Sequence, residues 1–105
     1  MFNGLYSLKS INLSNFDASS LTSMANIFNG LNSLETVDLK NFKSTSINNM
    51  SYMFYECTSL ISIDFSSFIS SLVTDMSFLF YGCTSLKSIN LNNLDNRYEI
   101  FILIM

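Results

Sequence analysis

The chain has 105 residues and a net charge of −3, and 49% of its residues are hydrophobic. This length fits one small domain with an apolar core, and the slightly acidic charge excludes the basic surface that binding to nucleic acid requires. His is absent, which removes the commonest general base and metal ligand, and two Cys are too few for a disulfide framework.

An internal repeat of about 26 residues runs through the chain. The units begin near residues 2, 28, 54 and 80, and the last unit is incomplete. Each unit carries the same apolar pattern, which includes a leucine at Leu8, Leu34, Leu60 and Leu86. Repeats of this length stack so that each unit contacts only its neighbours and the stack buries one continuous core. The sequence therefore predicts a solenoid over residues 1–95.

Each unit contains one predicted strand. In the third unit, Ile61, Ile63 and Phe65 alternate with polar residues, and this period of two with β-branched side chains is typical of a strand. The equivalent stretches in the other units are residues 10–13, 36–39 and 88–91. Four equivalent strands at a constant offset predict a parallel sheet with strands about 4.8 Å apart.

The other half of each unit has apolar residues three or four positions apart, which predicts one face of a short helix. Gly4, Gly30 and Gly82 follow these runs, where a left-handed residue commonly ends a helix, whereas Glu56 in the third unit predicts a looser turn. We therefore expect an α/β leucine-rich-repeat solenoid with one short parallel strand and one short helix per repeat. The three helical faces consist of Leu21, Met24, Ile27, Phe28 and Leu31; of Ile47, Met50, Met53, Phe54 and Cys57; and of Val73, Met76, Leu79, Phe80 and Cys83.

Both ends of the chain depart from the repeat. Met1 falls in the middle of a unit with no capping unit ahead of it, which suggests a fragment of a longer array or a gene start assigned too late. Residues 96–105 form an apolar tail, interpreted as a degenerate cap or a non-native end. Its segment Ile100–Met105 is too short to span a bilayer, and no signal peptide is visible at the N-terminus.

The repeat also carries a specific motif. Met53–Phe68 reads Met-Phe-Tyr-Glu-Cys-Thr-Ser-Leu-Ile-Ser-Ile-Asp-Phe-Ser-Ser-Phe, Phe80–Leu86 repeats its first part, and Leu13–Asp17 reads Leu-Ser-Asn-Phe-Asp. These motifs resemble the BspA-like class of leucine-rich repeats, and more closely the variant found in mycoplasma surface lipoproteins. The resemblance covers about residues 1–95. It implies a surface-exposed adhesin or interaction protein, at the cell surface or secreted, with a host or cell-surface protein as its partner.

One candidate binding surface is the exposed face of the predicted sheet. Asp38 and Asp64 should project from it side by side, and paired carboxylates can act in acid–base catalysis or hold Ca²⁺. A flat row lacks the pocket and the further oxygen ligands that either role requires, so we interpret it as a solvated polar face and predict no metal and no cofactor. The candidate residues on this face are Asn12, Thr36, Asp38, Ser62, Asp64 and Asn90.

A second candidate binding surface is aromatic. Tyr52 and Tyr55 are three residues apart beside the predicted helical face, and Phe78 and Tyr81 repeat this arrangement one unit along. The second unit has Asn26 and Asn29 at the same positions. The four rings form either a stripe that binds a partner or a cover for the edge of the core, and the sequence leaves both interpretations open.

Cysteines and asparagines recur at two further repeat positions. Cys57 and Cys83 share the position that Leu31 fills in the second unit, so we predict buried thiols, although a disulfide between neighbouring coils is geometrically conceivable. A side-chain amide recurs just after three of the four predicted strands and predicts a structural ladder, in which each amide bonds the backbone of the next coil. These positions are Asn15, Asn41 and Asn93, with Ser67 in the third unit.

These patterns together predict a non-catalytic protein-binding repeat module. An enzyme is the least expected function, because no nucleophile has an identifiable base and the chain has no His. The same patterns also fit an intracellular protein-interaction scaffold built from the same repeats, or a non-functional fragment of a longer array. The expected partner is a protein, with no nucleic acid and no transmembrane segment.

Overall fold

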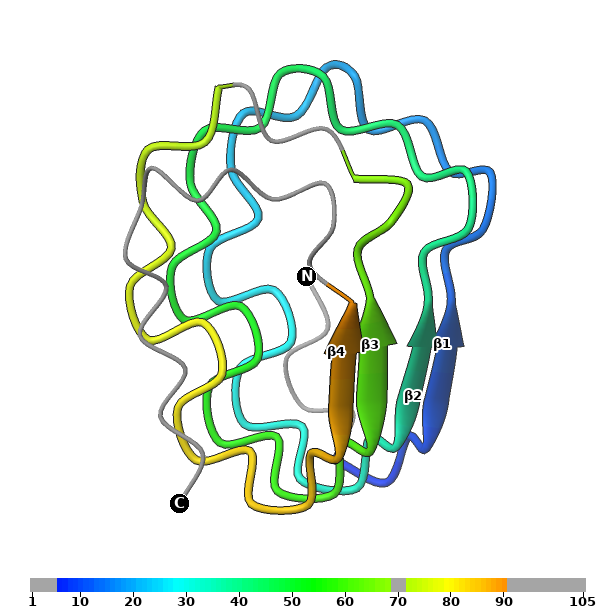
Figure 1. The fold of residues 1–105 in the computed structure, drawn as a ribbon, viewed down its shortest axis with the longest axis vertical. Coiled ribbons are helices and arrows are strands. Elements are labelled where there is room, and N and C mark those ends of the chain that lie inside the picture. The colour runs from blue at the N-terminus through cyan, green and yellow to red at the C-terminus, as the bar shows by residue number, and fades with distance from the viewer. Residues whose placement is uncertain (1–5, 69–71, 91–105) are drawn as a thin grey trace.

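The computed structural model describes residues 6–68 and 72–90. Over these residues the chain winds into stacked coils, with a four-stranded parallel sheet along one side (Figure 1). The strands are β1 (Ser10–Asn12), β2 (Thr36–Asp38), β3 (Ser62–Asp64) and β4 (Ser88–Asn90), in the spatial order β1-β2-β3-β4. The predicted parallel strands are therefore present, one in each repeat.

The register of the sheet follows the sequence repeat. Ser10 pairs with Thr36, Thr36 with Ser62, and Ser62 with Ser88. Successive side chains of a strand point to opposite faces, so the central residue of each strand turns inward and its polar neighbours turn outward. The central residues Ile11, Val37 and Ile63 are buried, whereas the flanking residues of β1 and β2 are exposed.

The predicted helix in each repeat is wrong. Across residues 6–68 and 72–90 the structure has no helix, and the stretches expected to be helical are successive turns, here called the turn wall (residues 21–31, 47–57 and 73–83). A helix needs a continuous run of negative φ. The turn wall instead has a left-handed residue twice in each coil. These are Asn26 and Gly30, Tyr52 and Glu56, and Phe78 and Gly82, with φ of 61° and 75°, 57° and 55°, and 56° and 79° respectively.

Backbone hydrogen bonds show why turns replace the helix. The N–H of Met24 donates to the carbonyl of Asn49 in the next coil (2.9 Å), and the N–H of Phe28 donates to Met53 in the same way (3.0 Å). The intervening Ile27 donates to Met24, three residues back (3.3 Å). The three-residue turns thus produce the same apolar spacing as a helix, which is why the pattern misled the prediction.

The spacing between coils explains this arrangement physically. Strands in a sheet lie about 4.8 Å apart, whereas neighbouring helices pack about 8–10 Å apart. Coil-to-coil backbone hydrogen bonds in the turn wall keep that side at a spacing similar to the sheet. The third turn is also not looser, because Glu56 adopts the same left-handed conformation as Gly30 and Gly82 and donates its N–H to the carbonyl of Tyr81 (2.6 Å).

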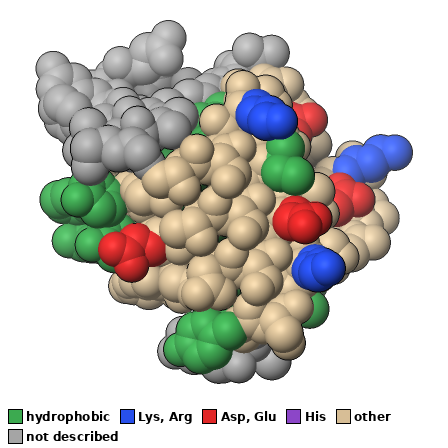
Figure 2. Space-filling view, turned by 90° about the horizontal axis from the view of Figure 1, so that it is seen from below, with side chains coloured by type: hydrophobic (Ala, Val, Ile, Leu, Met, Phe, Trp, Pro, Cys, Tyr) green, Lys and Arg blue, Asp and Glu red, His purple; other side chains and the backbone are tan. Residues whose placement is uncertain are grey.

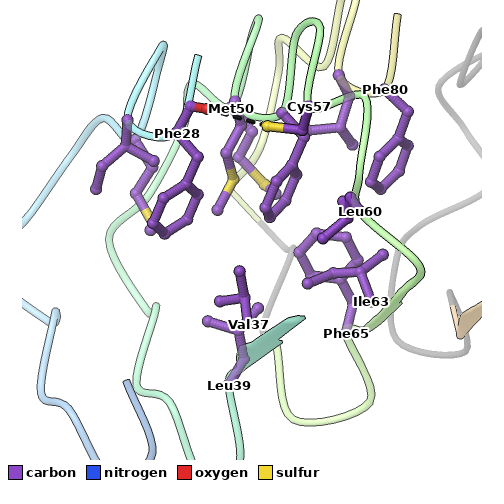
Figure 3. Packing of buried hydrophobic residues seen from close by; sticks show 14 of the residues in the cluster. Phe28, Val37, Leu39, Met50, Cys57, Leu60, Ile63, Phe65 and Phe80 are labelled. Carbon is purple, nitrogen blue, oxygen red and sulfur yellow. Dashed lines mark hydrogen bonds between the residues drawn. The ribbon is translucent and has the colours of Figure 1, made fainter. Parts of the chain in front are cut away.

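A single core lies between the sheet and the turn wall. Figure 3 shows Phe28 and Phe80 from the turn wall directed into the same interior as Val37 and Ile63 from the sheet. Equivalent rings stack from coil to coil, with Phe54 at 5.2 Å from Phe28 and 5.6 Å from Phe80 between ring centroids. All residues of the three predicted helical faces are buried except Leu21, which is partly buried. The prediction of which residues face the core was therefore correct despite the wrong backbone.

Candidate functional site

Four aromatic side chains meet on the outer side of the turn wall, and we call Tyr52, Tyr55, Phe78 and Tyr81 the aromatic cluster. Tyr52 stacks on Phe78 and Tyr55 stacks on Tyr81, with centroids 5.0 and 5.1 Å apart and planes tilted by 19° and 12°. Within each coil the neighbouring rings also touch, at 5.3 Å for Tyr52 and Tyr55 and 5.8 Å for Phe78 and Tyr81. The structure therefore brings the four residues singled out in the sequence into one contiguous group, in which each ring contacts two others.

The backbone beneath the aromatic cluster is unusual. Tyr52 and Phe78 have φ of 57° and 56°, a left-handed conformation that is unfavourable for bulky side chains. Asn26 holds the same position one coil earlier with φ of 61°, and Asn tolerates this conformation better. Because the three residues share one conformation in register, the backbone directs their side chains the same way.

The aromatic cluster is partly open to solvent and firmly supported. Phe78 is 42% exposed, and the other three rings are half-buried. Each of the four rings has a sequence neighbour that is completely buried in the core, namely Met53, Phe54, Leu79 and Phe80. The rings therefore have little freedom to rearrange, which lowers the entropy lost on binding a partner.

A carboxylate lies next to the aromatic cluster. Glu56 follows Tyr55 and is exposed, and its Cγ lies so close to Gly82 that a Cβ added there would be 3.0 Å away. Loss of solvent around the ring, followed by the negative charge of Glu56, raises the pKa of Tyr55. Tyr55 is therefore neutral at physiological pH and presents an uncharged ring beside a charged carboxylate.

The six sheet-face candidates also lie in rows. Asn12 pairs in register with Asp38, and Asp64 pairs with Asn90. One oxygen of each acid closes the following turn: Asp38 Oδ1 accepts from the N–H of Lys40 (2.9 Å), and Asp64 Oδ1 accepts from that of Ser66 (2.8 Å). Asn12 Oδ1 does the same for Ser14 (2.9 Å). The outward residues Thr36 and Ser62 lie beside each other at the start of β2 and β3.

A hollow of about 500 Å³ lies where the chain leaves β2 and β3. Asp38, Asp64, Lys40 and Asn41 contribute to its lining. The Ser66 hydroxyl and N–H lower the pKa of Asp64, so this carboxylate stays ionised at neutral pH. Lys40 supplies a positive charge to the same hollow, and the described part of the chain has no group of three potential metal ligands. The hollow is therefore a surface depression lined by both polar and apolar residues.

Comparison with known proteins assigns the family. Residues 1–101 match the family model described as Mycoplasma protein of unknown function, DUF285. The chain belongs to this family. No curated protein and no solved structure matches it. In the part of this DUF285 chain that the structure describes, no helix could cross a membrane.

The two thiols of this DUF285 chain are free and buried, as predicted. Each Sγ lies 3.0 Å from a carbonyl oxygen of the preceding coil, that of Phe28 for Cys57 and that of Phe54 for Cys83. Burial raises the pKa of Cys57 to about 12 and that of Cys83 to about 11. Both thiols are therefore protonated at neutral pH and poor nucleophiles.

The amide ladder exists between the first two coils. Asn41 Nδ2 donates to Asn15 Oδ1 (3.1 Å), so the amides bond each other, whereas the sequence suggested bonds to the backbone. Both residues are left-handed, with φ of 61° for Asn15 and 56° for Asn41. Asn93 of the predicted ladder, and the predicted tail 96–105, lie outside the described residues.

Sequence reasoning expected left-handed residues at Gly30 and Gly82 and missed the non-glycine ones. A signal was present for these as well, since Asn occupies three of them: Asn15, Asn26 and Asn41. The aromatic and acidic residues at the equivalent positions of the later coils concealed it.

Proposed function

We propose that this chain is a non-catalytic, polypeptide-binding repeat module that uses the aromatic cluster as its contact surface. The observation that carries the proposal is the placement of Tyr52 and Phe78 in left-handed backbone positions on an exposed wall. A bulky residue there costs about 1–3 kcal/mol, and Asn26 shows that the same coil geometry is built without it. Stability alone therefore does not account for the two rings, whereas a binding role does.

The chemistry of the aromatic cluster supports a protein partner. Aromatic side chains combine a large apolar area with few rotatable bonds, and Tyr is enriched in protein interfaces. Tyr52, Tyr55 and Tyr81 also offer hydroxyl groups at their tips, so the surface can form both apolar contacts and hydrogen bonds with a polypeptide.

The resemblance to BspA-like repeats supports a more specific role, that of a surface-exposed adhesin or interaction protein. On this proposal the partner is a host or cell-surface protein and the location is the cell surface or the secreted fraction. An intracellular protein-interaction scaffold built from the same repeats would use the same binding chemistry inside the cell. Antibody labelling of intact cells against permeabilised cells separates the two.

Selection from a displayed random-peptide library tests the binding role. The immobilised chain is compared with a variant carrying Tyr52→Asn, Tyr55→Asn, Phe78→Asn and Tyr81→Asn, which copies the Asn26–Asn29 pair of the preceding coil. Asn is chosen over Ser because it tolerates the left-handed backbone. We expect the chain to enrich specific peptides and the variant to bind none of them.

The matched control is Ile61→Glu. It replaces an exposed apolar residue with glutamate, the residue type that Glu35 supplies at the equivalent position one coil earlier. This variant should bind the selected peptides as well as the original chain. Circular dichroism must show that both variants fold. Equal binding by the folded four-Asn variant, or no enrichment on the original chain, would contradict the proposal.

A further inference from the structure

The aromatic cluster ends in a step on the side facing the preceding coil. Phe78 covers one face of Tyr52, and Tyr81 covers one face of Tyr55. Below the two tyrosines, the same positions hold Asn26 and Asn29, whose side chains are much shorter. The outer parts of the two tyrosine rings therefore extend beyond the amides beneath them, and we call these overhanging ring faces the tyrosine ledge.

The floor of the tyrosine ledge is polar. Asn29 Nδ2 donates to Asn26 Oδ1 (2.8 Å), which holds the two amides together. This bond leaves Asn29 Oδ1 as a hydrogen-bond acceptor with no partner among the described residues. A ligand on the ledge thus meets flat π faces on one side and an open acceptor on the other.

The charged side chains of the turn wall are all acidic. The turn wall carries Glu56 and Asp75 and has no Lys or Arg, whereas the four described lysines all lie outside it. Figure 2 shows lysine side chains with acidic ones among them on the right, the sheet side of Figure 1, and a hydrophobic group with an acidic side chain but no lysine on the left. Glu56 has no cationic partner in residues 6–68 and 72–90.

A planar cation fits these features best. The face of an aromatic ring attracts cations, and guanidinium also stacks flat on it while donating hydrogen bonds in its own plane. We propose that the tyrosine ledge receives an arginine side chain of a partner polypeptide, stacked on Tyr52 and Tyr55 and attracted by Glu56, which follows Tyr55 in the sequence. This inference rests on the proposed polypeptide-binding function and specifies the partner as basic.

The test uses the complete chain and a short acetylated, amidated peptide of arginine spaced by glycine and serine. A second peptide replaces each arginine with citrulline, which keeps the shape and removes the charge. Resonances of the tyrosine rings are followed by NMR during each titration. We expect the arginine peptide to shift the rings of Tyr52 and Tyr55 and to bind at least about fivefold more tightly than the citrulline peptide.

Two variants locate the effect. Glu56→Gln, at an exposed side chain, should weaken binding of the arginine peptide and leave binding of the citrulline peptide unchanged. Tyr6→Asn, at an exposed tyrosine outside the aromatic cluster, should change neither. Added salt should weaken binding of the arginine peptide alone, because charge attraction is screened.

The outcomes separate this inference from the proposed function. Equal affinity for the two peptides, or no binding of the arginine peptide while library-selected peptides bind the aromatic cluster, overturns the arginine inference and leaves polypeptide binding in place. Failure of the arginine peptide together with failure of the library selection overturns both.

Discussion

The sheet and the turn wall both hold successive coils of the chain together, but they restrict the sequence to different degrees. Both walls join successive coils through backbone hydrogen bonds, as in the bond from Leu13 to Asp38 (2.8 Å) beside the sheet and from Gly30 to Tyr55 (2.8 Å) in the turn wall. The strands use ordinary extended backbone, which nearly any residue adopts. The turn wall needs left-handed residues in every coil, and a side chain there is tolerated at a cost.

This difference indicates where the molecule is sensitive to change. On the outward face of the sheet, Asn12, Asp38 and Asp64 close equivalent turns through the same side-chain oxygen, so Asn and Asp serve alike at this position. The turn wall combines buried thiols, strained backbone and the aromatic cluster in the same short stretches. We therefore expect changes in the turn wall to alter stability strongly and changes on the sheet face to alter it little.

The largest effect is expected from the thiols at high pH. An unfolded thiol ionises at about pH 8.5, whereas burial raises the pKa of Cys57 to about 12 and that of Cys83 to about 11. The folded state therefore keeps protons that the unfolded state loses, so stability is complete below about pH 8.5 and falls as the pH rises toward the folded-state values. Each thiol lowers the free energy of unfolding by about 1.4 kcal/mol per pH unit, or on the order of 5 kcal/mol for both at about pH 10.5.

Urea unfolding followed by circular dichroism in a reducing buffer measures this loss across the alkaline range. The control is the double variant Cys57→Ser and Cys83→Ser, whose hydroxyls donate to the same carbonyls and do not titrate. Its stability should fall less steeply with pH, because only the tyrosines and lysines are left to titrate in this range. Identical alkaline slopes for the two proteins would refute the assignment to the thiols.

An intermediate effect is expected from two glycines of the turn wall. A Cβ added to Gly82 would lie 3.0 Å from Glu56 Cγ and 3.2 Å from Glu56 Cα, whereas one added to Gly30 would meet nothing within 4 Å. Both residues are left-handed, so both changes to Ala carry backbone strain. We expect Gly30→Ala to lower the free energy of unfolding by about 1 kcal/mol and Gly82→Ala by about 2–3 kcal/mol, because steric overlap is added. Urea unfolding of the two variants at neutral pH measures both changes in the free energy of unfolding. Equal changes would show that Glu56 moves away from the added Cβ without cost.

The smallest effect is expected on the sheet face. Asp64→Asn should change the free energy of unfolding by less than about 0.5 kcal/mol at neutral pH, because Asn12 closes the equivalent turn with the same atom type. The Ser66 hydroxyl and N–H lower the pKa of Asp64, so this carboxylate stabilises the fold above about pH 3.9 and loses that contribution as the pH falls through its folded value. Acid unfolding should therefore show a slightly weaker pH dependence in the variant. A large decrease in the free energy of unfolding at neutral pH would mean that the sheet face is as sensitive to substitution as the turn wall.

Much of the architecture could be read from the repeat. The strand positions, the parallel pairing in register and the inward set of apolar residues all follow from the spacing, because identical units that stack must place identical side chains at the same depth. The same logic placed Tyr52 beside Phe78 and Tyr55 beside Tyr81. The apolar spacing could not distinguish a helix from successive three-residue turns, because both bury nearly the same positions.

The sequence by itself thus determined the repeat, the strands and the core residues, because hydrophobic periodicity depends only on the order of residues along the chain. Only the tertiary structure decided the conformation of the turn wall, because the choice between a helix and turns depends on where the backbone N–H groups find acceptors. In this chain Met24, Asn26 and Phe28 find them in the neighbouring coil. That choice also creates the left-handed positions that hold Tyr52 and Phe78 in the aromatic cluster.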